Sequence, residues 1–278
     1  MNLIFLVIAS EDPVHQNDLL TQQNTWARNL PKDSQVIWLR GHQKNTFEFD
    51  GATLMVPCLE LYGNILEKTI LGVRYINDNM KFDVLIRTNV STYFNVERTL
   101  LELSKKSYSD NFFGGYIDKT KGVYFGNTGK HDYISGTGIF LSRNASEKLA
   151  TLDFTKFRGT PDDVAISHFL ESSGIPKVRM KRNNLSSTHI FIPTYYIRAK
   201  SSAVSTLAST RMELIDKYFE ATKPMGRLAA YIQLLAVELD AFLNHPEPKI
   251  RYLQRNRVVF QNFLVLKGGS LWRQIIQR

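Results

Sequence analysis

The sequence predicts an α/β fold followed by a helical extension, and two observations lead to this prediction. Short apolar runs rich in β-branched residues alternate with segments of helical pattern as far as about Ser205, and only helical patterns follow beyond it. Strands that alternate with helices indicate a mainly parallel sheet with helices on both faces. The predicted strands span residues 3–10, 35–41, 52–57, 82–89, 111–117 and 138–142.

The predicted helices occupy the segments between and after these strands. The last of them ends before Gly174, because a glycine can close a helix in the left-handed conformation. The predicted helices span residues 17–29, 61–79, 95–105, 144–152 and 162–173.

The extension carries one apolar stripe whose residues are four or three positions apart. This is the spacing of one helix face, and it predicts packing against a core. The stripe consists of Leu228, Ile232, Leu235, Leu239 and Phe242. The segment 244–249 then contains two prolines and precedes a tail in which apolar and basic residues interleave. We therefore predict two domains, one over residues 1–205 and a basic helical extension over residues 206–278.

Length and composition fit a folded chain, since 278 residues of which 43% are hydrophobic can bury a substantial core. Cys58 is the only cysteine, so no intramolecular disulfide can form, and the cytoplasm is the expected location. The apolar run Leu3–Ala9 has no basic residue before it, which predicts a buried strand rather than a signal peptide. The apolar segment Leu228–Leu243 contains two acids and falls short of the roughly 20 residues of a bilayer span, so no transmembrane helix is expected.

The formal net charge is +9, and most of it lies near the C-terminus. Between Lys223 and Arg278 there are nine Lys or Arg residues against three Asp or Glu residues. Such a surface attracts nucleic acid, anionic lipid or a phosphorylated ligand, and it also occurs as a plain solvated face. No RNA- or DNA-binding module is recognisable, so nucleic acid is not an expected partner. The interleaved apolar and basic residues permit peripheral contact with an anionic membrane.

Polar motifs follow several of the predicted strands, and ligands of such a sheet bind beyond the carboxyl ends of its strands. Each motif is weak by itself, because a sequence such as "SGTG" is common in loops. Their order along the chain is the informative feature. The motifs are "ELYGNILEKT" (60–69), "LIRTNVSTYFN" (85–95), "DYISGTGIFLSRNA" (132–145) and "PDDVAISHFLESSGI" (161–175).

In this order the motifs resemble those of the β-1,3-galactosyltransferase and fringe family of inverting glycosyltransferases, which have the GT-A fold. The similarity runs from Thr25-Trp26 to Ile175. The similar positions are Glu60, Tyr62, Asn64-Ile65, Lys68-Thr69, Arg87 to Asn95, Tyr133, Ser135, Gly136, Gly138, Ile139, Ser142, Asp162-Asp163-Val164 and Gly174. The resemblance implies a UDP-sugar donor, with contacts from Asn64, Lys68, Arg87, Thr88, Asn89 and Ser91.

The chain departs from the family at the acidic triplet that helps hold a divalent cation on the donor diphosphate, because Asn89 and Ser91 stand there. Neutral oxygens hold a hard dication poorly unless carboxylates come from elsewhere, so Mn²⁺ or Mg²⁺ is left open but not expected to be required. His189 is the one candidate metal ligand, and a structural or solvated histidine is the preferred interpretation. Further carboxylates that could reach the site are Asp83, Asp118 and Asp132.

A leaving diphosphate needs its charge neutralised, and basic side chains can do this where no cation binds. For each basic residue near the motifs, the alternative interpretation is an ordinary surface cation, because Lys and Arg are mostly exposed in proteins. The candidates are Arg87, Lys177, Arg179, Lys181, Arg182, Arg198 and Lys200.

The resemblance places catalysis at the pair Asp162-Asp163, because an inverting transfer needs a base for the acceptor hydroxyl. Asp163 matches the family's base, and Asp162 is the alternative, although a helix-capping role also suits Asp162. The segment 135–138, with Ser135, Gly136, Thr137 and Gly138, is predicted to be a loop that approaches the donor or acceptor sugar, since glycine lets a backbone come close. A tight turn before the strand at Ile139 is the other interpretation.

The sequence thus predicts an inverting transferase that moves a hexose, galactose or an N-acetylhexosamine, from a UDP-sugar to a saccharide or lipid-linked saccharide. It would act in the cytoplasm, in the assembly of surface polysaccharide of the O-antigen or capsule type. The alternative is a catalytically degenerate GT-A fold that binds a saccharide or a partner protein. The missing acids at Asn89 and Ser91 favour the alternative, and the retained Asp162-Asp163 pair argues against it.

Overall fold

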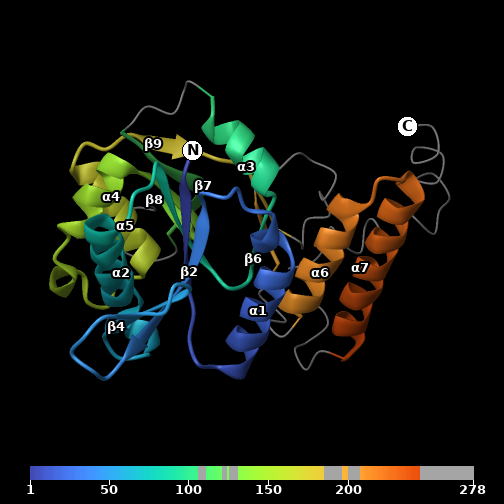
Figure 1. Ribbon diagram of the computed structural model, residues 1–278, viewed down its shortest axis with the longest axis horizontal. Coiled ribbons are helices and arrows are strands. Elements are labelled where there is room, and N and C mark those ends of the chain that lie inside the picture. The colour runs from blue at the N-terminus through green and yellow to red at the C-terminus, as the bar shows by residue number, and fades with distance from the viewer. Residues whose placement is uncertain (106–110, 121–123, 125–130, 185–195, 200–206, 245–278) are drawn as a thin grey trace.

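The computed structural model describes residues 1–105, 111–120, 124, 131–184, 196–199 and 207–244. A mixed eight-stranded sheet forms its centre, in the order β3-β4-β2-β1-β5-β8-β7-β9 (Figure 1). The pairs β4–β2, β2–β1 and β1–β5 are parallel, whereas β8 runs antiparallel to both β5 and β7. The strands are β1 (Leu3–Ile8), β2 (Gln35–His42), β3 (Glu48–Phe49), β4 (Thr53–Pro57), β5 (Val84–Asn89), β7 (Phe113–Lys119), β8 (Asp132–Ser142) and β9 (Lys177–Arg179).

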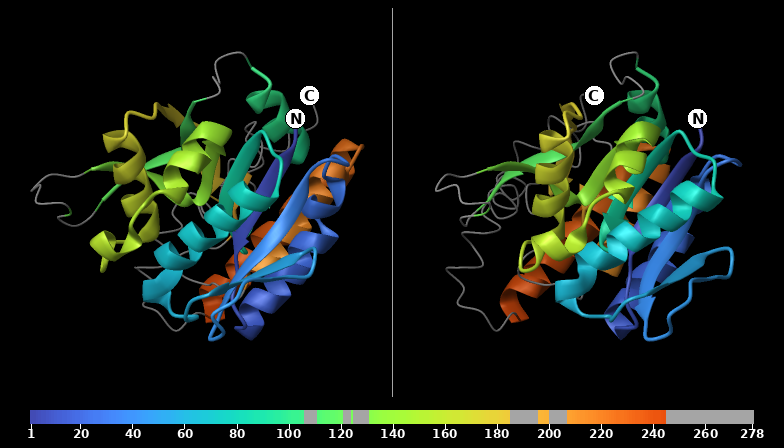
Figure 2. Two further views of the ribbon diagram at one scale, coloured as in Figure 1. Left: turned by 60° about the vertical axis from the view of Figure 1, so that its left-hand side comes forward. Right: turned by 90° about the vertical axis from the view of Figure 1, so that its left-hand side faces the viewer.

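Helices cover both faces of this sheet. Figure 2 shows α2, α4 and α5 on one face, while α1 and α6 lie on the other. The helices are α1 (Pro13–Asn24), α2 (Ile65–Asn79), α3 (Val96–Leu103), α4 (Arg143–Ala150), α5 (Asp162–Ser172), α6 (Ala208–Glu220) and α7 (Pro224–Asn244), with the 3-10 turns η1 (Trp26–Asn29), η2 (Tyr62–Asn64) and η3 (Phe154–Phe157). The predicted α/β class and helical C-terminal part are confirmed.

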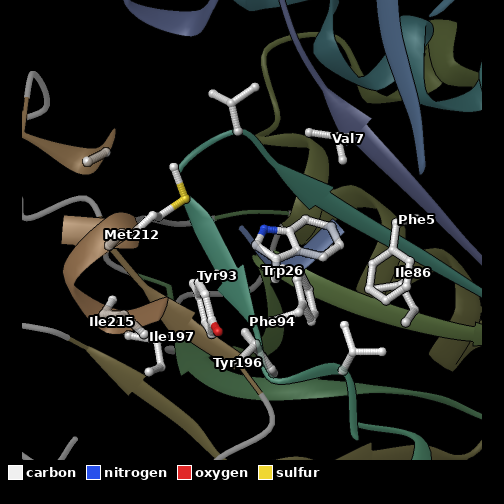
Figure 3. Close-up of a cluster of buried hydrophobic side chains, with 14 of the residues drawn as sticks. Phe5, Val7, Trp26, Ile86, Tyr93, Phe94, Tyr196, Ile197, Met212 and Ile215 are labelled. Atoms are coloured by element: carbon white, nitrogen blue, oxygen red, sulfur yellow. The ribbon is translucent and has the colours of Figure 1, made fainter. Parts of the chain in front are cut away.

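The central strand β1 is buried on both sides and divides the core into two layers. Leu3, Phe5 and Val7 belong to the layer under η1 and α6, while the alternate residues of β1 belong to the layer under α2 and α5. Figure 3 shows the first layer, in which the ring centroids of Phe5, Trp26 and Phe94 lie 5.0 to 5.2 Å from one another. Trp26, one of the residues of the resemblance, is therefore part of the core, with 1% of its surface exposed.

A second, three-stranded sheet lies beside the carboxyl end of β5. It consists of β10 (Arg182–Asn184), β11 (Tyr196–Arg198) and β6 (Thr92–Phe94), in that order. None of these strands was predicted, because three residues are too few for an alternating pattern to be recognised. Tyr196 of β11 stacks on Phe94 of β6 at a centroid distance of 5.5 Å and ties this small sheet to the core (Figure 3).

The prediction of a loop or tight turn at residues 135–138, that is Ser135, Gly136, Thr137 and Gly138, is wrong. These residues lie inside β8, where the ladder with β7 jumps from Ile139 opposite Gly115 to Ile134 opposite Ile117. The four residues therefore form an enlarged β-bulge opposite the single residue Tyr116, and the backbone groups of Gly136 and Thr137 bond side chains. We call residues 135–138 the β8 bulge.

The helical extension packs on the α/β part through α6. Met212 and Ile215 of α6 and Leu235 of α7 belong to the same buried cluster as Trp26. Leu228 and Leu235 of the predicted apolar stripe are buried, but Ile232 is 47% exposed. The side chains of Leu239 and Phe242 lie outside the described residues.

The buried positions of α7 include Tyr231 and Glu238 instead of Ile232, so the buried face is rotated from the predicted stripe. Glu238 forms an ion pair with Arg211 of α6, and the two side chains are 4% and 0% exposed. Within the described ranges, no helix is both long and apolar enough to span a bilayer. The basic tail 245–278 lies outside the described residues, so its predicted membrane contact and the predicted domain boundary stay predictions.

Candidate active site

The candidate site lies at the edge of the sheet where the parallel strands β1 and β5 both end. Ile8 and Asn89 are register partners, so the two strands end side by side. The turn that follows Asn89 is fixed by Gln22 of α1, whose amide donates to the carbonyls of Asn89 and Thr92 at 3.1 Å each. This role of Gln22 is not predictable from local sequence patterns, because the bonds span about 70 residues of chain.

The side chain of Asn89 is directed into its own turn. Its Oδ1 accepts hydrogen bonds from the hydroxyls of Ser91, at 3.1 Å, and Thr92, at 2.9 Å. Both acceptor sites of the amide oxygen are thereby occupied. Asn89 and Ser91 consequently offer a poor ligand set for a hard dication, which prefers carboxylates.

Arg87 and the two adjacent aspartates meet at the β8 bulge. The guanidinium of Arg87 donates to Asp162 Oδ2 and to the carbonyl of Gly136, each at 2.5 Å. The N–H of Gly136 in turn donates to Asp163 Oδ2 at 3.0 Å, and Asp163 Oδ1 accepts from the N–H of Val164 at 3.0 Å. Arg87 thus bonds Asp162 directly, while the backbone of Gly136 links Arg87 to Asp163, and each aspartate receives a different partner.

A side chain at position 136 would require Arg87 to move. A Cβ there would lie 2.6 Å from Nη1 of Arg87 and 3.4 Å from Oδ2 of Asp163. Close approach at Gly136 was expected, but the expected neighbour was a sugar. In the structure the groups that approach this glycine are the side chains of Arg87 and Asp163.

The electrostatic environments of the two aspartates differ. Asp162 faces the buried guanidinium of Arg87. Burial, followed by the negative charge of Asp162, raises the pKa of Asp163 to about 6. Burial, followed by the negative charge of Asp163, raises the pKa of the nearby Tyr133 to about 12. Asp163 is therefore a carboxylate that can exchange a proton near neutral pH.

Lys68 and Thr88 bond groups within the protein, whereas Nε of Arg87 is buried and has no hydrogen-bond partner among the described residues. Lys68, which is 4% exposed, donates to the carbonyl of Ala9 at 2.8 Å and to Glu60 at 2.9 and 3.1 Å. The hydroxyl of Thr88 donates to the carbonyl of Thr137 at 2.7 Å. These residues brace the strand ends, and the donor contacts expected from them remain predictions.

The other predicted site residues are more dispersed. Asn64 precedes α2, and its amide donates to Glu67 at 2.7 Å. Asp83 lies at the opposite edge of the sheet, at the start of β5, where it accepts from the N–H of Asn2. His189 and Lys200 lie outside the described residues. Among the described residues, no three His, Cys, Asp or Glu side chains come together in a way that could hold a metal ion.

A separate hollow of about 580 Å³ lies between α3, β6 and α6. Trp26, Tyr93 and Phe219 are among its walls, and Asp216 and Arg227 contribute charge. None of the predicted site residues lines it, and the position of the motifs at the strand ends favours the Asp162-Asp163 region as the site of chemistry.

Comparison with known proteins identifies no relative by sequence, since no family model and no curated protein match the chain. Among solved structures, a glycosyltransferase involved in the glycosylation of the major capsid of PBCV-1 covers 76% of this chain and 99% of its own, at 7% identity and a TM-score of 0.46.

Two further solved structures are similar to the chain at a comparable level. The galactosyltransferase LgtC, in complex with donor and acceptor sugar analogs, covers 80% of this chain and 98% of its own, at 11% identity and a TM-score of 0.47. The glycosyltransferase GlyE of Streptococcus pneumoniae TIGR4, in its apo form, covers 76% of this chain and 59% of its own, at 11% identity and a TM-score of 0.42. Likenesses this low carry no conclusion about activity, which has to come from the residues of this chain.

Proposed function

We propose that the protein is an inverting glycosyltransferase with the GT-A fold, and that Asp163 is its catalytic base. The observation that carries this proposal is the pair of adjacent aspartates in unlike environments at the carboxyl edge of the sheet. Arg87 compensates the charge of Asp162. Asp163 is held by two backbone N–H groups and has a pKa near 6, so it is ionised and able to accept a proton at neutral pH.

The proposed reaction is a single displacement at the anomeric carbon of a UDP-sugar. Asp163 takes the proton of an acceptor hydroxyl as the oxygen of that hydroxyl forms a bond to the anomeric carbon. The bond from that carbon to the diphosphate oxygen breaks, and UDP leaves with the electron pair. The N–H groups of Gly136 and Val164 fix the carboxylate, which removes the need to order it during the reaction.

The donor and acceptor classes follow the motif resemblance. We propose a hexose donor, UDP-galactose or a UDP-N-acetylhexosamine, and a saccharide acceptor that belongs to surface polysaccharide synthesis. The basic extension suits a lipid-linked acceptor at the inner face of a membrane, because cations favour anionic leaflets. We propose that no divalent cation is required, since Asn89 and Ser91 do not suit one.

Calorimetric titration with UDP, with ADP as the control nucleotide, tests the nucleotide class. We expect heat from UDP that exceeds the heat from ADP and that persists in excess chelator. Release of UDP from a panel of UDP-sugars then identifies the donor. If UDP does not bind with Mn²⁺ or without it, the UDP-sugar proposal fails and the alternative, a saccharide- or partner-binding module, takes its place.

A further inference from the structure

Two arginines lie on one face of the small sheet, beside the β8 bulge. Arg182 of β10 is the register partner of Tyr196, and Arg198 follows Tyr196 by two positions in β11. Because alternate residues of a strand point to the same side, Arg182, Tyr196 and Arg198 share a face. Arg182 and Arg198 occupy diagonal positions on this face, and the charge of Arg198 acts on Arg182 while both cations act on Tyr133, so the two guanidinium groups are near enough to share one small anion.

Arg182 is a buried cation with neutral partners. It is 9% exposed, and its Nη1 donates to the hydroxyls of Ser135 and Thr137, at 2.8 Å each. Its guanidinium carbon lies 3.9 Å from the ring centroid of Tyr116. Its Nε is buried and has no hydrogen-bond partner among the residues that the structure describes.

The charge of Arg182 is thus not balanced by a bonded carboxylate within the described part of the chain. Burial is the largest cause that lowers the pKa of Arg182, and the like charge of Arg198 lowers it further, while Tyr196, Tyr116 and Asp118 act in the opposite direction. A buried charge without a counter-ion is strongly unfavourable. An anionic ligand bound between Arg182 and Arg198 would remove this penalty.

The arginine pair adjoins the strand end at which the resemblance expects a metal. Arg198 is the register partner of Thr92, and the N–H of the next residue, Ala199, donates to the carbonyl of Ser91 at 2.9 Å. On the other side, Arg182 bonds the β8 bulge, which also holds Asp163 through the N–H of Gly136. The pair therefore lies between the Asn89–Ser91 turn and the bulge that positions the proposed base.

We propose that Arg182 and Arg198 bind the diphosphate of the nucleotide-sugar donor, in the role that a divalent cation has in the family that the motifs resemble. This inference rests on the proposed function. A guanidinium matches the geometry of phosphate oxygens with two parallel N–H donors and keeps its charge at every working pH. The pair stabilises the negative charge that develops on the leaving UDP.

A purely structural role for Arg182, as a brace of the β8 bulge, makes a different prediction. If Arg182 were only a brace, its substitution would destabilise the protein without changing the affinity for anions. Substitution of Arg198 would then leave anion affinity unchanged as well. Arg198 is only partly buried, so its replacement perturbs the fold less than the replacement of Arg182 does.

The test is calorimetric titration of the full-length chain in excess chelator, with inorganic pyrophosphate and with UDP. The variants are Arg182→Gln and Arg198→Gln, with Arg179→Gln as the control for loss of one exposed cation from the same basic segment. We expect each of the first two variants to weaken both ligands by about tenfold or more, as the loss of charge-assisted hydrogen bonds does. Arg179→Gln is expected to stay within about twofold.

Each outcome decides the inference. Unchanged pyrophosphate affinity in Arg198→Gln overturns it, even if Arg182→Gln does not fold, and so does a wild-type chain that binds neither ligand. A loss of affinity in Arg179→Gln equal to that in Arg198→Gln also overturns it, because it shows nonspecific attraction. If pyrophosphate binds through the arginine pair but UDP binds no better than ADP, the anion site stands and the UDP-sugar function fails.

Discussion

Replacing Asp163 by asparagine is expected to stabilise the protein at neutral pH, whereas the same change at Asp162 is expected to destabilise it. Burial and Asp162 raise the pKa of Asp163 from its ordinary 3.8 to about 6. A shift of about two units corresponds to roughly 3 kcal/mol between the protonated and ionised forms. The folded state therefore holds the proton of Asp163 more tightly than the unfolded state does.

The sign of the pH dependence follows from this difference. The contribution of Asp163 to the free energy of unfolding is fully present below about pH 4 and is lost as pH rises through about 6. Above that range the ionised side chain lowers the free energy of unfolding by roughly 1–3 kcal/mol. The upper value corresponds to the full pKa shift, and the lower value allows for screening by solvent, because the side chain is only half-buried. Asp163→Asn removes this loss and keeps an oxygen that can accept from the N–H of Gly136.

The matched variant Asp162→Asn leaves the guanidinium of Arg87 without its carboxylate. The Arg87 side chain is 5% exposed in this ion pair and that of Asp162 is 16% exposed, so we expect a loss of about 1–3 kcal/mol. Urea denaturation at about pH 4.5 and at about pH 7.5 measures both variants against the wild type. Equal destabilisation by the two substitutions at the higher pH would refute the assignment of Arg87 to Asp162 and of the raised pKa to Asp163.

Three further predictions follow from the site and the extension. The initial rate of transfer is expected to rise with pH and to level off above about 6, because Asp163 acts in its ionised form; a rate that falls over the same range contradicts this. Gly136→Ala is expected to displace Arg87, whose Nη1 lies 2.6 Å from the added Cβ, and to lower both activity and stability, the latter by about 1–3 kcal/mol in urea denaturation. Arg211→Met is expected to destabilise by about 3–5 kcal/mol, because it removes the cation that pairs with the buried Glu238 between α6 and α7, and a second change, Glu238→Leu, should recover most of that loss. An undisturbed single variant would show the ion pair to be unimportant.

The longer helices and strands were predictable from the sequence because the pattern of apolar residues that indicates each one lies within its own segment. The apolar run of β1 and the helical pattern of α2 depend on periodicity alone, and the structure has both. Gly174 closes α5 in the left-handed conformation, with a φ of 76°, as expected. The sheet is more mixed than predicted, because the antiparallel direction of β8 depends on a connection that leaves no local signal.

The β8 bulge shows what the sequence alone does not reveal. Gly136 and Gly138 predict a turn or loop, but in the structure another side chain comes close to each of these glycines. At Gly136 that side chain is Arg87, and at Gly138 it is Tyr196, whose ring would lie 2.9 Å from an added Cβ. Both partners are about 50 residues or more away in the sequence, so only the folded chain shows the reason.

The assignment of the aspartates was predictable in part. The resemblance of the motifs singled out Asp162 and Asp163 as a pair. It could not show that Arg87 bonds one of them while the peptide of Gly136 bonds the other, because this arrangement depends on contacts between β5, β8 and α5. Arg182 was one of several basic candidates, and its burial with neutral partners is what distinguishes it.

Asp163 is proposed to accept the proton of the acceptor hydroxyl in a UDP-sugar transferase. The most direct test is the release of UDP from the donor by Asp163→Asn, measured together with the affinity of the same variant for UDP. We predict that turnover falls by about 100-fold or more while the affinity for UDP stays within a few-fold of wild type. Turnover preserved in a folded, UDP-binding Asp163→Asn variant would show that Asp163 is not the base.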